Sequence, residues 1–86
     1  MSEMKKALHK VVSRYDVHIR QELWKKIAHA EQSKLEHSII SIWTNELSPE
    51  DMLQLKLDIE AVALAHSYSI SVFYNNIVML MDLEER

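Results

Sequence analysis

Residues 49–84 read PEDMLQLKLDIEAVALAHSYSISVFYNNIVMLMDLE, and this stretch gives the strongest indication of the fold. One set of mostly apolar side chains recurs in it every three or four residues, which is the spacing of one face of an α-helix. We therefore predict a single helix over about residues 49–84, roughly 54 Å long at 1.5 Å per residue. The recurring positions are Met52, Leu55, Ile59, Val62, His66, Ile70, Phe73, Ile77 and Leu80.

The start of this helix is marked by the tetrapeptide Ser48-Pro49-Glu50-Asp51. A serine caps the exposed amides of a first turn, and proline suits the first helical position because its missing donor costs nothing there. The local propensities of residues 67–71 are poor for a helix and alternate like those of a strand. Because the helical spacing continues through them, we predict helix with a possible kink near Ser67 or Ser69.

The first half of the chain, residues 2–46, predicts one or two further helices. An apolar face runs from Met4 through Leu8 and Val11 to Ile19, and then changes direction. Glu22 stands where the face would continue, so a kink or short break is expected between Tyr15 and Glu22, with Asp16 as a candidate cap. Ser33 followed by Glu36 has the spacing of a capping box and predicts a second helix start. A single curved helix is the alternative.

Composition restricts the chemistry open to the chain. Its 86 residues contain no glycine and no cysteine, and they predict one domain over residues 1–86. Glycine-rich phosphate loops and EF-hand loops are thereby excluded, as are disulfides and cysteine-based metal sites. Tight hairpins are disfavoured too, and no internal repeat is visible. The fold class that follows is all-α: a helical hairpin or small helical bundle with the long C-terminal helix over about 49–84.

The long predicted helix is apolar on more than one side. A helix of that kind is buried on several sides, and 86 residues offer too little chain to cover it. We therefore expect dimerisation to complete the bundle, with a partner or dimer interface formed by surplus apolar residues. These residues are Leu53, Leu57, Leu64, Val72, Met79 and Leu83.

Charge is divided unevenly along the sequence. Residues 1–34 hold eight basic and four acidic side chains, whereas residues 35–86 hold two basic and nine acidic ones. The basic residues Lys6, Lys10, Arg14 and His18 recur every four residues and form a candidate surface for an anionic partner. The alternatives are a solvated helix face and mutual neutralisation of two antiparallel helices.

Little in the sequence indicates catalysis or metal binding. None of the five histidines follows an acidic residue by three positions, as the carboxylate-bundle metal motif requires. We expect no catalytic residues, no metal, no cofactor and no small-molecule substrate. His66 lies in the predicted helical stripe, where it is either a core histidine or part of a pH-sensitive dimer seam.

These observations predict a small non-enzymatic regulatory or adaptor protein that acts by protein–protein binding as a homodimer. A nucleic-acid-binding regulator that uses the basic N-terminal helix is the first alternative, and a self-assembling structural protein is the second. The apolar run of residues 70–83 is interrupted by Asn75, Asn76 and Asp82 and is shorter than the ~20 residues that span a bilayer. We therefore expect a cytoplasmic protein without a membrane contact.

Overall fold

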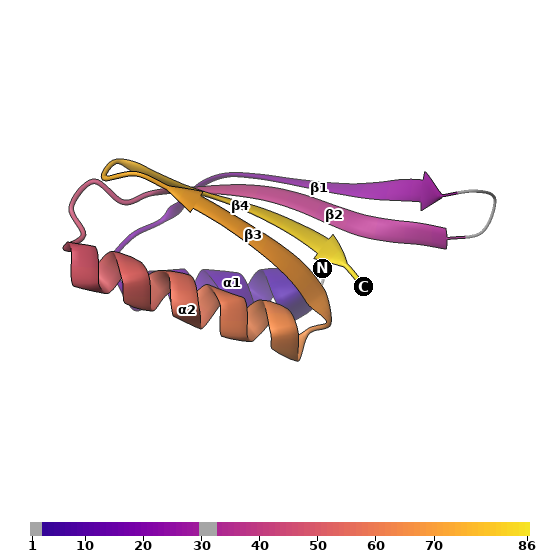
Figure 1. The fold of residues 1–86 in the computed structure, drawn as a ribbon, viewed down its shortest axis with the longest axis horizontal. Helices are drawn as coiled ribbons and strands as arrows, with labels where there is room; N and C mark the ends of the chain where they lie inside the picture. The colour runs from indigo at the N-terminus through magenta and orange to yellow at the C-terminus, as the bar shows by residue number, and fades with distance from the viewer. Residues whose placement is uncertain (1–2, 30–32) are drawn as a thin grey trace.

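The computed structural model describes residues 3–29 and 33–86, with side chains for 3–26 and 35–86 (Figure 1). This part of the chain forms two helices, each followed by two strands. They are α1 (Glu3–Ser13), β1 (Ile19–His29), β2 (Ser33–Trp43), α2 (Pro49–Ala65), β3 (Tyr68–Tyr74) and β4 (Val78–Glu85).

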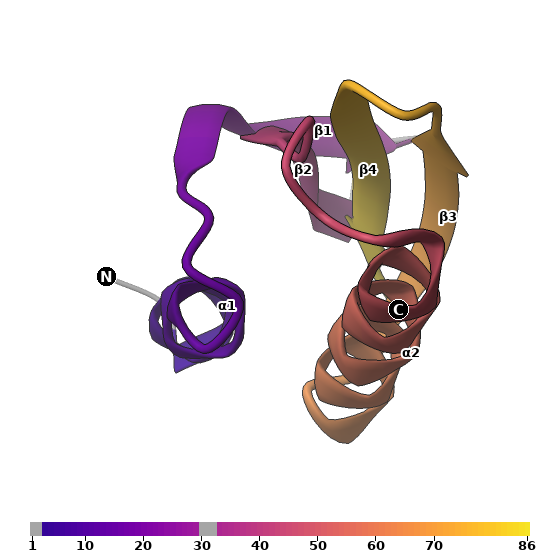
Figure 2. The same cartoon turned by 90° about the vertical axis from the view of Figure 1, so that its left-hand side faces the viewer.

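The four strands form one antiparallel sheet in the order β1-β2-β4-β3. Both helices lie on the same side of this sheet, α1 below the β1–β2 hairpin and α2 below β3 and β4 (Figure 2). The protein is thus a two-layer α/β fold. The predicted all-α helical hairpin or bundle is wrong.

The start of the predicted long helix is confirmed, and its end is wrong. The Ser48 side chain accepts a hydrogen bond from the Asp51 amide at 3.1 Å, and Pro49 occupies the first turn. The helix stops at Ala65, however, and Ser67 has a φ of 62°, which turns the chain back. Residues 68–85 then form the β3–β4 hairpin, because their aromatic and β-branched side chains favour a pleated sheet.

The first half also combines a confirmed helix with unexpected strands. Met4, Leu8, Val11 and Val12 form the buried face of α1, as their spacing predicted. The helix ends at Ser13 and a turn covers residues 14–16, so the break begins slightly before the predicted range from Tyr15 to Glu22. A hairpin follows in place of a second helix. Ser33 begins β2, so the predicted capping box there is wrong.

The chain repeats one unit, a helix followed by a hairpin, and the two copies meet where β2 pairs with β4. Each helix is followed by a residue with positive φ, Asp16 at 56° and Ser67 at 62°. An offset of 51 residues relates these two positions. The same offset relates the buried Leu8 of α1 to the buried Ile59 of α2.

The core lies between the sheet and the helices. The inward side chains of β2 and β4 alternate with outward ones, as a half-covered antiparallel sheet requires. Tyr68 lies edge-on to Trp24 in this layer, with ring centroids 6.3 Å apart. The buried apolar residues are Met4, Leu8, Val11, Val12, Val17, Ile40, Ile42, Met52, Leu55, Ile59, Ala63, Tyr68, Met79, Met81 and Leu83.

The β3–β4 turn is built without glycine. The side-chain oxygen of Asn75 accepts hydrogen bonds from the amides of Ile77 and Val78, at 2.8 and 3.0 Å. The Asn75 amide in turn donates to the Val78 carbonyl at 3.1 Å. An asparagine side chain that bonds to the backbone in this way mimics part of a turn, so the hairpin needs no glycine.

Candidate functional site

The most distinctive surface is the sheet face that the helices leave uncovered, which we call the open face. Large apolar side chains lie on it where an antiparallel sheet normally presents polar ones. Phe73 is 65% exposed, and Leu80 and Leu23 are each 44% exposed. Its apolar members are Leu23 of β1, Ile39 and Trp43 of β2, Phe73 of β3 and Leu80 of β4.

Strand register makes these side chains neighbours. Leu23 is directly opposite Ile39, and Phe73 is directly opposite Leu80. Ser41 pairs with Leu80, which places Ile39 and Leu80 diagonally across the β2–β4 junction. Such cross-strand and diagonal neighbours contact one another in a sheet. The apolar residues therefore form one diagonal band that crosses all four strands.

Charged groups border this band on one side, and one of them, Asp82, stands directly opposite Ile39. His37 Nδ1 lies 3.2 Å from Asp82 Oδ1 across the β2–β4 pair. Lys25 and Glu84 both pair with His37 and extend the same row. Both signs of charge occur in the row, so this border is polar without being strongly basic or acidic.

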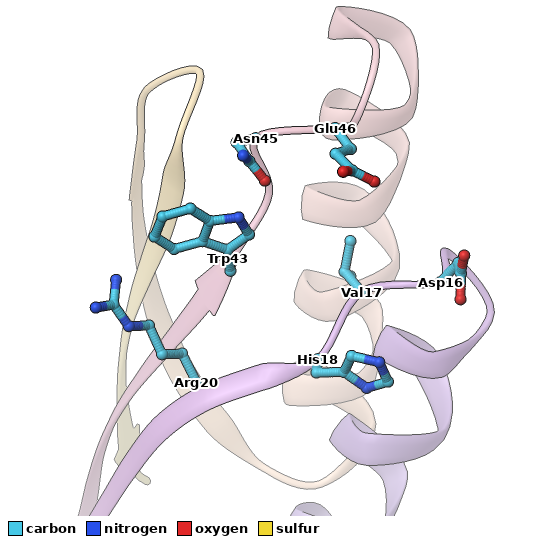
Figure 3. A pocket seen from close by; sticks show the side chains of 7 residues that line it. All are labelled: Asp16, Val17, His18, Arg20, Trp43, Asn45 and Glu46. Atoms are coloured by element: carbon cyan, nitrogen blue, oxygen red, sulfur yellow. The ribbon is translucent and has the colours of Figure 1, made fainter.

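At the other end of the open face, Arg20 and Trp43 form a stacked pair. The guanidinium carbon of Arg20 lies 4.9 Å from the centroid of the Trp43 ring, which is a cation–π contact. The pair lines an open hollow of about 540 Å³ between the end of the sheet and the loops that lead to the helices (Figure 3). The remaining lining residues are Asp16, Val17, His18, Asn45 and Glu46.

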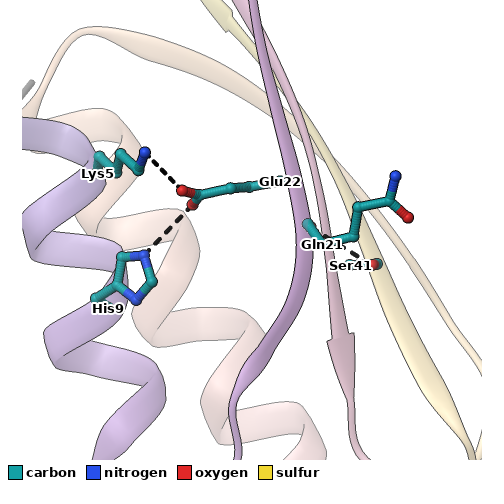
Figure 4. A network of polar contacts seen from close by, with 5 residues as sticks. All are labelled: Lys5, His9, Gln21, Glu22 and Ser41. Atoms are coloured by element: carbon teal, nitrogen blue, oxygen red, sulfur yellow. Dashed lines mark hydrogen bonds and ion pairs between the residues drawn. The ribbon is translucent and has the colours of Figure 1, made fainter. Parts of the chain in front are cut away.

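The covered side of β1 carries a polar cluster with a structural role. The Glu22 carboxylate points at α1, where Lys5 Nζ lies 2.7 Å from Oε1 and His9 Nε2 lies 3.4 Å from Oε2 (Figure 4). Gln21 and Ser41 lie on the opposite side of the strands. Glu22 thus fixes α1 to β1, and this explains why an acid interrupts the predicted apolar stripe.

Two tyrosines make further side-chain bonds between elements. The Tyr68 hydroxyl donates to Glu36. Burial, followed by this hydrogen bond, raises the pKa of Tyr68 above its usual value. The Tyr15 hydroxyl donates to Asp58 and thereby connects the turn after α1 with α2. Both bonds hold structural elements together on the helix side of the sheet.

The residues predicted as a partner or dimer interface divide into two groups. Leu53, Leu57 and Leu64 lie on the outer side of α2 and are 49%, 48% and 61% exposed. Met79 and Leu83 are fully buried in the core of the same chain. Val72 is half-buried and packs against that core. Only the three leucines are accessible to a partner, because the other side chains already fill the interior.

The structure places the predicted basic stripe on α1 and on the segment that follows it. Lys6 and Lys10 lie on α1 and are exposed, with Lys6 Nζ 3.9 Å from Glu3 Oε1. Arg14 follows the helix, in the turn that leads to the Tyr15–Asp58 bond. His18 lies beyond that turn, beside the hollow that Arg20 and Trp43 line.

The stripe that contained His66 ends with α2, because the predicted long helix stops at Ala65. His66 is half-buried and caps the end of α2, where its amide donates to Val62 and Ala63. The pH-sensitive dimer seam at His66 stays a prediction. Among the side chains that the structure describes, those of residues 3–26 and 35–86, no three acidic or histidine groups gather closely enough to hold a metal ion.

Sequence reasoning did not identify the open face. Its members are far apart along the chain, and only the β2–β4 pairing makes them neighbours. The available indication was the alternation of apolar and polar residues over 68–72 together with the apolar run from Ile77 to Met81.

Among the described helices, none is long and apolar enough to cross a membrane. No protein-family model and no curated protein matches the sequence.

Proposed function

We propose that this protein is a small non-enzymatic binding protein that holds another protein on the open face of its sheet. The apolar band across all four strands supports this proposal. An isolated exposed apolar residue needs no explanation. Large contiguous apolar patches with a polar border are characteristic of interaction sites. The regulatory or adaptor role and the cytoplasmic location remain predictions from the sequence.

The chemistry of the face indicates what its partner must present. The apolar band requires an apolar surface on the partner, such as one face of an amphipathic helix. The border with Lys25 and Glu84 requires both signs of charge around that surface. The Arg20–Trp43 pair suits the anchor of such an interface, since tryptophan and arginine are the residues most enriched at binding hot spots.

A nucleic-acid partner is the weaker alternative. Phe73 and Trp43 offer two aromatic rings for stacking, and Arg20 offers a positive charge. However, Asp82 and Glu84 lie on the same face, where they would repel phosphates. Lys6 and Lys10 belong to α1, which lies on the covered side of the sheet (Figure 2).

Affinity capture from the native host tests the proposal with matched variants. Leu80→Lys places a charge in the centre of the band, and Lys10→Glu changes a charge on α1. We expect Lys10→Glu to retain the proteins captured by the wild type and Leu80→Lys to lose them, while the circular dichroism spectra of all three agree.

The opposite result would contradict the proposal. If Leu80→Lys retains every captured protein, the open face is not the binding surface. If the retained material is nucleic acid, is released by nuclease or high salt, and is lost in a Lys6/Lys10/Arg14 triple alanine variant, the protein is a nucleic-acid binder.

A further inference from the structure

The two edges of the sheet differ in how they are protected. β1, at one edge, has a register shift between Ile19 and Gln21 and carries Arg20, Glu22, Lys25 and Lys26. Charges and bulges of this kind prevent other strands from pairing with an edge. β3, at the other edge, reads YSISVFY and has no charge, no proline and no bulge. The β3 edge is therefore open to a further strand.

The exposed leucines of α2 lie on the same flank of the molecule as this edge. Leu64 and Glu60 line a surface hollow together with Ser69 and Ile70 of β3. Leu53 and Leu57 share the helix side of Leu64 because they precede it by eleven and seven residues. Asp58, which bonds to Tyr15, faces α1 instead. The flank thus presents an unpaired strand above a stripe of three leucines.

We propose that this flank binds a second copy of the chain, with β3 pairing antiparallel to the partner subunit's β3. A two-fold axis perpendicular to the sheet relates the copies and produces one eight-stranded sheet in the order β1-β2-β4-β3-β3-β4-β2-β1. The α2 helices of the two copies then lie side by side, and their leucine stripes cover one another. Both open faces remain on the same side and form one double-length binding face.

The charges at the ends of the flank favour this antiparallel arrangement. Arg86 lies at the beginning of β3, where its amide donates to the Ser67 carbonyl at 2.9 Å and its Nε donates to Ser69 at 3.1 Å. Pro49, the first residue of α2, and Tyr74, the last residue of β3, line one hollow at the other end of the flank. Glu50 and Asp51 in the first turn of α2 therefore lie at that end. Antiparallel pairing brings Arg86 of each copy towards the acidic helix start of the other.

The dimensions of the flank agree with a reversible dimer. β3 has seven residues and is about 23 Å long, and α2 has seventeen residues and is about 25 Å long. The strand and the helix therefore run side by side over nearly the same length. The two layers together present an area on the order of 500 Å² on each copy, or about 1,000 Å² over both copies, which is at the low end for a specific interface. We expect a micromolar dissociation constant.

Sedimentation equilibrium over a range of protein concentrations tests this proposal. Leu57→Lys places a positive charge in the leucine stripe of α2. Ser71→Lys places one in the edge strand β3, on the side of the open face. Each is expected to weaken dimerisation at least tenfold. Leu23→Lys is the matched control, since Leu23 is equally exposed but belongs to the β1 edge of the open face. It should leave the dimer unchanged and should impair partner capture, so the two surfaces are tested separately.

Charge reversal tests the direction of pairing. Glu50→Arg should weaken the dimer, and a Glu50→Arg/Arg86→Glu double variant should restore it. Hydrogen exchange of the wild type provides a measurement that needs no variant. The amides of Ile70 and Val72 alternate with those that bond to β4 and point to the free edge. They should become more protected at high protein concentration, and the amides of β1 should not.

Three results would overturn the proposal. The first is a wild-type protein that remains monomeric up to about 1 mM, well above the expected dissociation constant. The second is a dimer that Leu23→Lys abolishes and Leu57→Lys does not, which would place the contact on the open face. The third is growth into large assemblies with no closed dimer, as expected of a self-assembling structural protein.

Discussion

The hydroxyl of Tyr15 donates a hydrogen bond to the carboxylate of Asp58 and so ties the turn after α1 to the middle of α2. Gln54 donates to the other oxygen of the same carboxylate at 2.9 Å. The Tyr15 bond first, and the Gln54 bond second, hold the pKa of Asp58 below its usual value. The same bond to Asp58 raises the pKa of Tyr15 to about 12. The turn after α1 is therefore joined to α2 by a polar contact, beside the apolar packing of the two helices.

Removing this contact should weaken the fold. We expect Tyr15→Phe to lower the free energy of unfolding by about 1 kcal/mol, the usual net contribution of one partly exposed hydrogen bond. Urea denaturation followed by circular dichroism measures the change. Tyr74→Phe removes a hydroxyl from an exposed tyrosine at the end of β3 and serves as the control. Equal stability of Tyr15→Phe and wild type would show that the bond contributes nothing.

The contribution of the Tyr15–Asp58 bond should depend on pH at both extremes. Folding raises the pKa of Tyr15 from 10.0 to about 12, so its stabilisation is complete below pH 10.0 and is lost as the pH rises towards 12. Folding lowers the pKa of Asp58 from 3.8, so its stabilisation is complete above that pH and is lost in stronger acid. The melting-temperature difference between wild type and Tyr15→Phe should be largest near neutral pH. A difference that grows above pH 10.0 would contradict this assignment.

Ser67 turns the chain between α2 and β3 with a φ of 62°. This left-handed conformation costs a residue with a Cβ atom about 1 kcal/mol, and glycine adopts it freely. Ser67→Gly should therefore stabilise the protein by about 0.5 kcal/mol after the greater freedom of glycine in the unfolded chain is counted. Asp16→Gly should increase stability less than Ser67→Gly does, because aspartate adopts the left-handed conformation more readily than serine.

The same substitution two residues later is the control for Ser67→Gly. Ser69 lies within β3, where glycine weakens a strand, so Ser69→Gly should destabilise the protein. Thermal denaturation of both variants at one protein concentration makes the comparison. Destabilisation by Ser67→Gly would show that the serine side chain contributes more than the backbone conformation costs.

Local features of the sequence predicted the parts of the fold that depend on neighbours in the chain. Ser48 and Pro49 marked the start of α2 correctly, because a helix cap involves residues three apart. The spacing of Met4, Leu8 and Val11 identified the buried face of α1 for the same reason. Strand pairing depends on residues such as Ile40 and Met81, which are distant in sequence, and no local pattern indicated which segments would meet.

The predicted long helix shows how helical spacing can arise by coincidence. Ile70, Phe73, Ile77 and Leu80 are three or four residues apart, yet they lie on both faces of a hairpin and in its turn. The buried positions of the strands follow a period of two, through Met79, Met81 and Leu83 in β4. That alternation was present in the sequence, and the longer helical pattern obscured it.

The absence of glycine did not have the consequence expected of it. Positive φ occurs at Asp16 and Ser67, and Asn75 closes the β3–β4 turn with its side chain. Short polar side chains can perform both tasks by bonding to the backbone. A chain without glycine is therefore not restricted to helices.

The candidate surfaces were predictable to different degrees. Leu53, Leu57 and Leu64 lie on a real helix, so helical spacing placed them on its outer side. The open face depends on the register of four strands, and nothing in the sequence joins Leu23 to Phe73. Met79 and Leu83 were assigned to a surface because a helix leaves that side uncovered, whereas in the strand the same side faces the core.

Thr44 is fully buried at the end of β2, and its amide donates to the Ile77 carbonyl at 2.8 Å. Its hydroxyl has no hydrogen-bond partner among the described residues. Burial of an unpaired hydroxyl costs about 1–3 kcal/mol. Thr44→Val removes the hydroxyl at similar volume and should stabilise the protein by about 1 kcal/mol. Thr44→Ser keeps the hydroxyl and loses a methyl group, and it should destabilise the protein by a similar amount. If urea denaturation shows that both substitutions destabilise the protein equally, the buried hydroxyl does not lower its stability.

Met79 and Leu80 are adjacent in β4 and point to opposite faces of the sheet. Met79 is fully buried, whereas Leu80 is 44% exposed on the open face. Met79→Ala removes side-chain atoms from the core and leaves a cavity, so it should cost about 2–5 kcal/mol in unfolding free energy. Leu80→Ala should cost less than about 1 kcal/mol, because much of the side chain is already in water. A single helix through residues 49–84 would give a different result, since Leu80 would belong to its main buried stripe. A larger loss of unfolding free energy for Leu80→Ala than for Met79→Ala would contradict the assignment of these residues to strand β4.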